Sequence, residues 1–282
     1  MPHNQVFFSP FFSGRSLAAF DTITRMSATG HKLQKDALSI MENVYNHEGA
    51  YIIEEALLGL ASVNVAAALA PEAPVLAQRL REAAARCDFE EREMVLSSLY
   101  RVLHSAGSLY SPEEQEAMRK IHGIPKQPGG ITPILLSLPF IRPESTVVDL
   151  GAGNGLQGLL MQKLAPHERT VMIEISANMI EAGKVMESGL GLEAGRVVWS
   201  HADLIEADLE DLAGGAPDLL YMYRPIKPVG EGRGFYKRIA EWIETWPGGS
   251  AIMSVADCMG SFLGSGIDKL YEDEFMTVFR KA

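Results

Sequence analysis

The chain has 282 residues, of which 47% are apolar and 22% are charged, an ordinary composition for a globular protein of about two domains. A collagen-like or largely disordered chain is therefore excluded. The formal charge is −11, and residues 131–282 hold 13 basic and 21 acidic side chains. An acidic protein is a poor partner for nucleic acid and for anionic membranes, so we expect neither.

The cysteine content and the N-terminus bear on the compartment. Cys87 and Cys258 are the only cysteines and lie far apart, which argues against a zinc site and for a reducing environment. The first residues lack the basic and apolar regions of a secretory signal. The longest weakly polar run is too short to span a membrane. We expect a cytoplasmic protein with no bound metal.

The first 130 residues are predicted to form helices only. Apolar residues recur at helical spacing over residues 33–45, 51–69, 75–86 and 89–105. In the last of these, Met94, Leu96 and Leu99 are expected on the buried face. Ser111 and Glu114 have the spacing of a capping box, which predicts a further helix starting there.

The basic residues of this half do not form a phosphate-binding stripe. Arg79, Arg86 and Arg92 alternate with glutamates, which predicts a surface of ion pairs instead.

The pattern changes after the Pro-Gly-Gly sequence at residues 128–130. Short β-branched runs then alternate with helical stretches, which is typical of a mainly parallel sheet. We predict an α/β domain over residues 131–282, preceded by an all-α domain over residues 1–130. The predicted strands are 146–150, 171–175, 197–201, 218–223 and 250–255, the helices are 155–164, 177–189 and 234–245, and a closing hairpin pairs 269–271 with 275–280.

A glycine loop follows the first predicted strand. Asp149 ends the strand, and Gly151, Gly153 and Gly155 occupy alternate positions before the next helix. Glycines allow a sharp turn and a close approach of the backbone to a ligand. This pattern is typical of a nucleotide-like cofactor that lies across the carboxyl ends of parallel strands.

Two further carboxylates follow the second and third strands. Glu174 lies 25 positions after Asp149, where a carboxylate can accept hydrogen bonds from the two hydroxyls of a ribose. Asp203 follows the third strand and can accept a hydrogen bond from an exocyclic adenine amine. A glycine loop followed by these two acids in order is a more specific pattern than the loop alone.

At these residues the chain resembles the class I S-adenosylmethionine-dependent methyltransferases, over roughly residues 131–282. The loop from Asp149 to Gly155 is similar to the first motif of that family, the segment from Glu174 to Met179 to the second, and the segment Ala202–Leu204 to the third. The segment that ends in Tyr223, Arg224 and Pro225 falls where the fourth motif lies.

The resemblance implies a Rossmann-like sheet, mostly parallel with an antiparallel C-terminal strand, and a set of cofactor contacts. The glycine-loop backbone would lie under the methionine part of S-adenosylmethionine, with Asp149 positioning its amino group. Glu174 would bind the ribose, and Tyr223 would lie beside the reacting methyl. The complete set of expected cofactor-binding residues is Asp149, Gly151, Ala152, Gly153, Gly155, Glu174, Ile175, Met179, Ala202, Asp203, Leu204 and Tyr223.

A dinucleotide is the rival cofactor, because Gly153, Gly155 and Gly158 also satisfy the GxGxxG pattern. A dinucleotide pattern would start at Gly153, two residues later than the first glycine after the strand, Gly151. It also places Asp149 beneath a pyrophosphate, which a carboxylate would repel. We therefore favour the methyl donor.

The candidate catalytic residues are Tyr223, Arg224 and His201, all at strand ends. Methyl transfer needs alignment of the nucleophile with the methyl group, and a hydroxyl or ammonium acceptor needs a base as well. Each candidate also has a structural interpretation: Tyr223 can pack beside Tyr221, Arg224 can pair with a carboxylate, and His201 can hold a strand end.

The sequence thus predicts a methyltransferase that acts on a small-molecule acceptor. An RNA- or protein-directed methyltransferase and a non-catalytic cofactor-binding module are the alternatives. The helical domain is expected to cover the site or to form a homodimer.

Overall fold

The computed structural model describes residues 52–62, 69–105, 110–120, 122–123 and 130–282. The predicted helix over residues 33–45 lies outside the described residues. Residues 63–68 of the predicted helix 51–69 also lie outside them. No helix of the described ranges is long and apolar enough to cross a bilayer.

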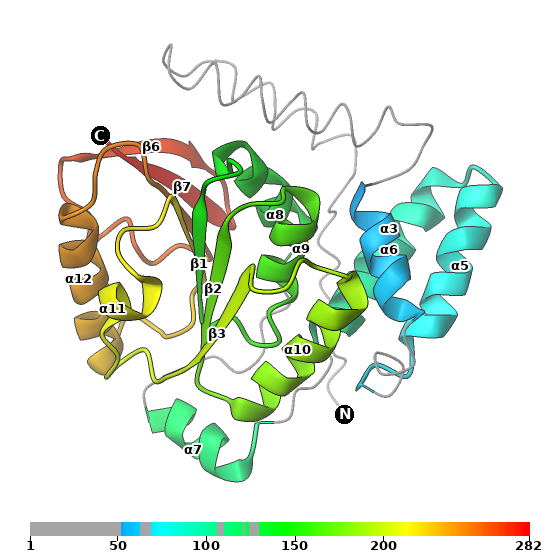
Figure 1. Ribbon diagram of the computed structural model, residues 1–282, viewed down its shortest axis with the longest axis horizontal. Coiled ribbons are helices and arrows are strands. Elements are labelled where there is room, and N and C mark those ends of the chain that lie inside the picture. Colours follow the sequence, from blue (N-terminus) through cyan, green and yellow to red (C-terminus); the bar gives the residue numbers. More distant parts are fainter. Residues whose placement is uncertain (1–51, 63–68, 106–109, 121, 124–129) are drawn as a thin grey trace, which may run out of the picture.

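The centre of the molecule is a seven-stranded sheet in the order β3-β2-β1-β4-β5-β7-β6 (Figure 1). Strands β1 to β5 are parallel, and β7 runs antiparallel to both of its neighbours. This confirms the predicted sheet with its reversed C-terminal strand. The strands are β1 (Thr146–Leu150), β2 (Arg169–Glu174), β3 (Val197–His201), β4 (Leu219–Tyr223), β5 (Ala251–Val255), β6 (Ile267–Glu272) and β7 (Met276–Lys281).

Helices cover both faces of this sheet, which explains why its central strands are apolar on both sides. On one face lie α8 (Ile131–Ser137), α9 (Leu156–Leu164) and α10 (Ala177–Leu190), and on the other α11 (Leu209–Ala213) and α12 (Glu231–Glu244) (Figure 1). Successive residues of β1 alternate between the two cores. Val147 belongs to the first hydrophobic cluster and Val148 to the second.

The helices α3 (Ile52–Ala61), α5 (Ala73–Ala85) and α6 (Phe89–His104) pack beyond α9 and α10 (Figure 1). Leu99 and Tyr100 of α6 share one hydrophobic cluster with Tyr221 of β4. The helical part and the sheet are therefore joined by a continuous apolar core. The predicted boundary at residue 130 stays a prediction.

Two details of α6 differ from the sequence analysis. Met94, expected in the core, is 52% exposed, and Tyr100 is buried instead because the apolar stripe is rotated about the helix axis. Arg92 is buried and its Nε lies 2.7 Å from Glu54 Oε2, so it is not a surface residue. Arg79 and Arg86 both pair with Glu91 at the surface, as expected.

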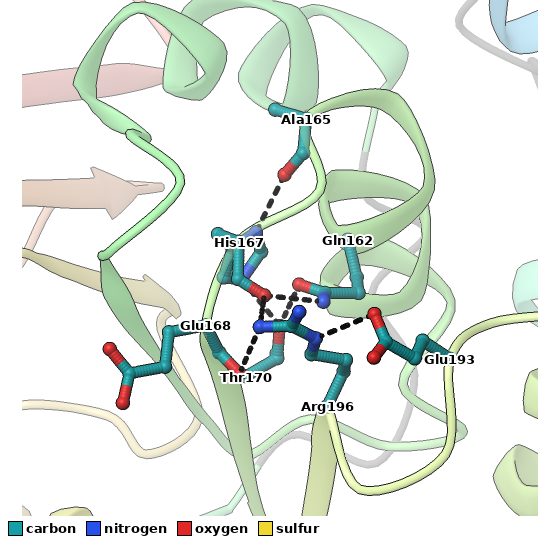
Figure 2. A network of polar contacts seen from close by, with 7 residues as sticks. All are labelled: Gln162, Ala165, His167, Glu168, Thr170, Glu193 and Arg196. Carbon is teal, nitrogen blue, oxygen red and sulfur yellow. Dashed lines mark hydrogen bonds and ion pairs between the residues drawn. The ribbon is translucent and has the colours of Figure 1, made fainter.

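The amino end of β2 holds a buried polar network (Figure 2). His167 Nδ1 lies 2.7 Å from the Ala165 carbonyl, and its Nε2 lies 2.6 Å from Thr170 Oγ1. Gln162 donates to the His167 carbonyl at 2.8 Å, and Arg196 pairs with Glu193 at 3.0 Å. This network ties the end of α9 to the start of β2 and satisfies its buried polar groups.

Candidate functional site

The glycine loop connects β1 to α9 at the carboxyl edge of the sheet. Gly151, Gly153 and Gly155 all have positive φ, at 74°, 59° and 71°. A Cβ at Gly151 would lie 2.6 Å from Pro225 Cβ, and one at Gly155 would lie 2.3 Å from the Trp199 ring. At Gly153 the nearest atom would be 3.5 Å away, so this glycine is required by its backbone conformation alone.

Helix α6 holds this loop in place. The buried Asn154 donates from Nδ2 to the carbonyl oxygens of Leu103 and His104, at 2.8 and 3.1 Å. These carbonyls belong to the last turn of α6, where they lack helical partners. The helical part of the chain therefore contributes directly to the loop geometry.

Glu174 is the last residue of β2 and lies beneath the loop, 3% exposed. Its Oε2 accepts the Gly153 N–H at 2.8 Å, and its Oε1 accepts the Ser176 N–H at 3.0 Å. Burial raises the pKa of this carboxyl, and the backbone donors oppose the increase. A carboxylate has about four acceptor positions, so Glu174 keeps acceptor capacity for a ligand.

Asp149 is buried at the end of β1, and its Oδ2 has no hydrogen-bond partner among the described residues. Burial raises the pKa of the Asp149 carboxyl to about 7, and the nearby Glu174 carboxylate adds to the increase. A hydrogen bond from the Gly158 backbone opposes this increase. A buried carboxylate oxygen that has no hydrogen bond, such as Oδ2, is costly to keep. Asp149 lies at the carboxyl edge of the sheet but is not among the residues that line the pocket there.

Polar side chains from α6, α9 and β4 surround Asp149. Gln157 donates to the Tyr221 hydroxyl at 3.0 Å, while the buried Tyr100 hydroxyl has no partner among the described residues. Burial raises the pKa of Tyr100 well above its ordinary value, and Tyr223 and Asp149 lie close enough to contribute. Burial also lowers the pKa of His104 to about 4, so this histidine is neutral.

A small pocket of about 50 Å³ opens at the carboxyl ends of the strands. It brings together the three predicted elements, because the loop and both acids contribute to its walls. Residues from α7 (Pro112–Lys120) and its flanks close the other side. Its lining residues are Tyr110, Met118, Gly123, Gly151, Glu174, Ile175, Asp203, Leu204, Pro225 and Ile226.

Helix α7 lies apart from α3, α5 and α6, at the edge of the sheet (Figure 1). The predicted capping box is confirmed, since Ser111 N donates to Glu114 Oε2 at 2.7 Å and Glu114 N to Ser111 Oγ at 3.1 Å. The same Glu114 oxygen accepts from the Ser176 hydroxyl at 3.0 Å. An isolated bridge between Gly123 and Ile226 fastens the other end.

The end of β3 places Asp203 and His201 differently. Asp203 lines the pocket, and its Oδ1 accepts the Ile205 N–H at 2.8 Å in a tight turn. His201 is exposed and its Nε2 lies 2.8 Å from the Ile175 carbonyl. His201 is not among the residues that line the pocket.

The end of β4 holds Tyr223 and Arg224, next to the pocket residue Pro225. Tyr223 is half-buried, and burial raises its pKa. Arg224 has a φ of 31°, and its Nε is buried without a partner among the described residues. Cys258, which follows β5, lies close to Arg224 and to Tyr236.

Most of the expected cofactor residues thus meet at one edge of the sheet. Ala152 and Met179 are buried beside the loop, and Ala202 is half-buried next to Asp203. Sequence patterns did not indicate the contributions of the helical part. These come from Tyr100, from Tyr110, and from Leu103 and His104, whose carbonyl oxygens accept from Asn154. Their contacts join segments far apart in the chain, and no local motif marks them.

Comparisons with known proteins give structural matches only. No protein-family model matches the chain, and no curated protein does. An RNA methyltransferase from Salinibacter ruber, solved with S-adenosyl-L-homocysteine, is 20% identical, with a TM-score of 0.42 over 55% of this chain and 92% of that one.

Two further solved structures are similar to this chain. An rRNA methylase from Streptococcus thermophilus is 15% identical, with a TM-score of 0.42 over 53% of this chain and 96% of that one. A SAM-dependent methyltransferase from Thiobacillus denitrificans is 17% identical, with a TM-score of 0.36 over 52% and 56%. These proteins share little sequence with this chain, so its function has to follow from its own site residues.

Proposed function

We propose that this protein is an S-adenosylmethionine-dependent methyltransferase. The observation that carries the proposal is the buried, unpaired Oδ2 of Asp149 beside a glycine loop whose neighbour Glu174 also faces the pocket. An ammonium group would give Asp149 Oδ2 the hydrogen-bond donor that it lacks, whereas the carboxylate would repel the pyrophosphate of a dinucleotide.

The residues fit the parts of this cofactor. Asp149 would hold the amino group, and the loop backbone at Gly151 and Gly153 would lie under the methionine part. Glu174 would accept from the ribose hydroxyls with the oxygen lone pairs that Gly153 and Ser176 leave free. Asp203 would accept from the adenine amine, and the apolar residues Ile175, Leu204 and Met179 would flank the ring.

When bound, S-adenosylmethionine would supply a sulfonium methyl group, which passes in line to a nucleophile as the carbon–sulfur bond breaks and the thioether leaves. The chain then has to hold the acceptor in line with that methyl group and to exclude water. Tyr223 and Arg224 end β4 at this edge, so we assign them to the acceptor side. His201 already contacts the Ile175 carbonyl, which makes it the weaker catalytic candidate.

The helical part would complete the site. Helix α6 braces the glycine loop through Asn154, and α7 covers the pocket. At about 50 Å³ the pocket is far smaller than the roughly 300–1,000 Å³ of pockets that enclose a cofactor. We infer that α7 moves away when the cofactor enters. A homodimer through the N-terminal helices stays a prediction.

Calorimetry with S-adenosylmethionine, S-adenosylhomocysteine and NAD tests the proposal. Both S-adenosyl compounds are expected to bind, and NAD is expected not to bind. Binding of NAD alone would sink the assignment.

A non-catalytic cofactor-binding module is the second candidate. It is favoured by the tight packing of Pro225 against Gly151, which closes the end of β4 on the pocket. Formation of S-adenosylhomocysteine in the presence of an acceptor screen separates the two, because a binding module releases the cofactor unchanged.

A further inference from the structure

One segment of this acidic protein is strongly basic. Residues 224–240 contain five cationic side chains and one carboxylate, Glu231, whereas the remaining residues after 130 hold 8 basic and 20 acidic side chains. The five cations are Arg224, Lys227, Arg233, Lys237 and Arg238. They lie in the loop after β4 and on α12, which starts at Glu231.

Two of these cations line a hollow of about 390 Å³, together with Pro228, Ser261 and Phe262. Arg233 and Lys237 lie one turn apart on α12, and both are exposed. Neither side chain makes an ion pair or a hydrogen bond with the part of the chain that the structure describes. Several exposed cations elsewhere do, such as Arg86 with Glu91 at 2.6 Å and Lys184 with Glu181 at 2.7 Å.

The hollow and the cofactor pocket lie against the same loop but share no lining residue. The loop after β4 lines both, with Pro225 and Ile226 on the pocket side and Pro228 on the hollow side. Tyr236 links them, because its hydroxyl donates to the Ile226 carbonyl at 2.7 Å and its ring stacks on Phe262 at 5.5 Å. A ligand in the hollow would therefore lie against the same loop as the proposed cofactor.

We propose that this hollow binds a phosphate group of the methyl acceptor. An arginine and a lysine without protein partners, with the Ser261 hydroxyl beside them, form a donor set suited to a phosphate. Phe262 adds an apolar wall beside these donors, against which the group that carries the phosphate can pack. The acceptor role rests on the proposed function, whereas phosphate binding does not.

The net charge of the chain does not determine the charge at this hollow. A charge of −11 disfavours a polyanion for the whole surface, but the field at one hollow depends on the charges near it. The phosphate can belong to a phosphorylated small molecule or to an RNA strand. Both share the recognising chemistry, and the experiment has to separate them.

The test compares two double variants with the wild type. Arg233→Gln with Lys237→Gln removes the cations of the hollow, and Arg81→Gln with Arg101→Gln removes two exposed cations of the helical part as a control. The probes are adenosine, adenosine 5′-monophosphate and a fluorescent single-stranded RNA, at one fixed salt concentration. Calorimetry measures the first two, and fluorescence anisotropy measures the RNA.

The phosphate probes are expected to bind more tightly than adenosine, and the hollow variant to lose roughly tenfold or more of that affinity. The control variant should lose less than about twofold. RNA that binds much more tightly than the mononucleotide identifies nucleic acid as the source, and similar affinities identify a small phosphorylated acceptor. Equal losses in both variants, or no preference for phosphate over adenosine, would overturn the proposal.

S-adenosylmethionine binding to the same variants keeps the two proposals distinguishable. Both double variants are expected to retain wild-type affinity, since neither changes a residue of the cofactor pocket. A protein that binds phosphate in the hollow but not S-adenosylmethionine would contradict the proposed function and leave the phosphate site standing.

Discussion

The two ends of the parallel strands handle buried polar groups in opposite ways. At the amino end of β2, His167, Thr170 and Gln162 satisfy one another and the nearby carbonyls (Figure 2). At the carboxyl end, Asp149 Oδ2 and the Tyr100 hydroxyl are buried without partners among the described residues, as is the Nε of Arg224. The other buried groups without a partner among the described residues are the uncharged indole N–H groups of Trp242 and Trp246, near the turn that leads into β5.

Backbone conformation follows the same division. Arg224 and Ala256 are non-glycine residues with positive φ, and they directly follow β4 and β5. Strain and unpaired ionisable groups are costly, and they persist where a ligand gains from them. The amino end of β2 thus satisfies its polar groups within the fold, whereas the carboxyl end holds unsatisfied groups at the edge where we propose that the cofactor binds.

The largest effect is expected from Gly155→Ala, because a Cβ there would lie 2.3 Å from the Trp199 ring and 2.6 Å from Met172 Sδ. Overpacking and a positive φ together should lower the free energy of unfolding by about 3–5 kcal/mol. Urea unfolding measures the loss.

Gly153→Ala is the matched control, since its Cβ has no atom nearer than 3.5 Å. It should cost only about 1–2 kcal/mol of stability while weakening S-adenosylmethionine binding, because the ligand approaches this backbone. Equal destabilisation by the two changes would mean that the positive φ, and not the contact with Trp199, sets the cost at both positions. Unchanged S-adenosylmethionine affinity in Gly153→Ala would contradict the close approach of the ligand to this backbone.

Glu174→Gln should weaken S-adenosylmethionine binding roughly 10- to 100-fold, about 1.4–2.8 kcal/mol, because an amide offers one acceptor oxygen instead of two. One oxygen still accepts from Gly153 or Ser176, so the chain should remain folded. Calorimetry measures the affinity.

Glu187→Gln is the control for this change, because Glu187 accepts from the Trp199 indole at 2.9 Å outside the pocket. A comparable loss of cofactor affinity in both variants would contradict the ribose assignment.

Thr170→Val should act at the amino end only. It removes the hydroxyl that lies 2.6 Å from His167 Nε2 and 3.2 Å from Gln162 Oε1, both buried. The expected cost is about 1–3 kcal/mol of stability with unchanged cofactor affinity. If Thr170→Val kept wild-type stability but lost cofactor binding, the amino end of β2 would serve the ligand as well, and the contrast between the two ends would be wrong.

The sequence predicted the sheet and the meeting of the site acids well. Runs of β-branched residues mark the strands, and the carboxyl ends of parallel strands necessarily share one edge, so Asp149, Glu174 and Asp203 converge. The capping box at Ser111 and Glu114 is equally local. These features depend on neighbours in the chain.

The contributions of the helical part could not be predicted. Asn154 reaches the end of α6 about 50 residues away, and Glu114 reaches Ser176 across 62 positions. Such contacts depend on how helices dock, which leaves no spacing pattern. The excess of cations at residues 224–240 is visible in the sequence, but it is local, because α12 as a whole carries three basic and three acidic side chains.

Asp149→Asn tests the central claim most directly. The folded-state pKa of this carboxyl is about 7 against an ordinary 3.8, so ionisation destabilises the fold as pH rises through 7. Three pKa units correspond to about 4 kcal/mol at high pH. The favourable contribution of the neutral carboxyl to stability is fully present below about pH 4 and is lost as the pH rises from 4 to 7.

The measurement is thermal unfolding at pH 5 and pH 8, together with S-adenosylmethionine affinity, for the wild type and Asp149→Asn. We expect the variant to be more stable than the wild type at pH 8, to depend less on pH, and to bind the cofactor more weakly. A variant that is less stable at pH 8 and binds S-adenosylmethionine with unchanged affinity would show that Asp149 serves the fold and not the ligand.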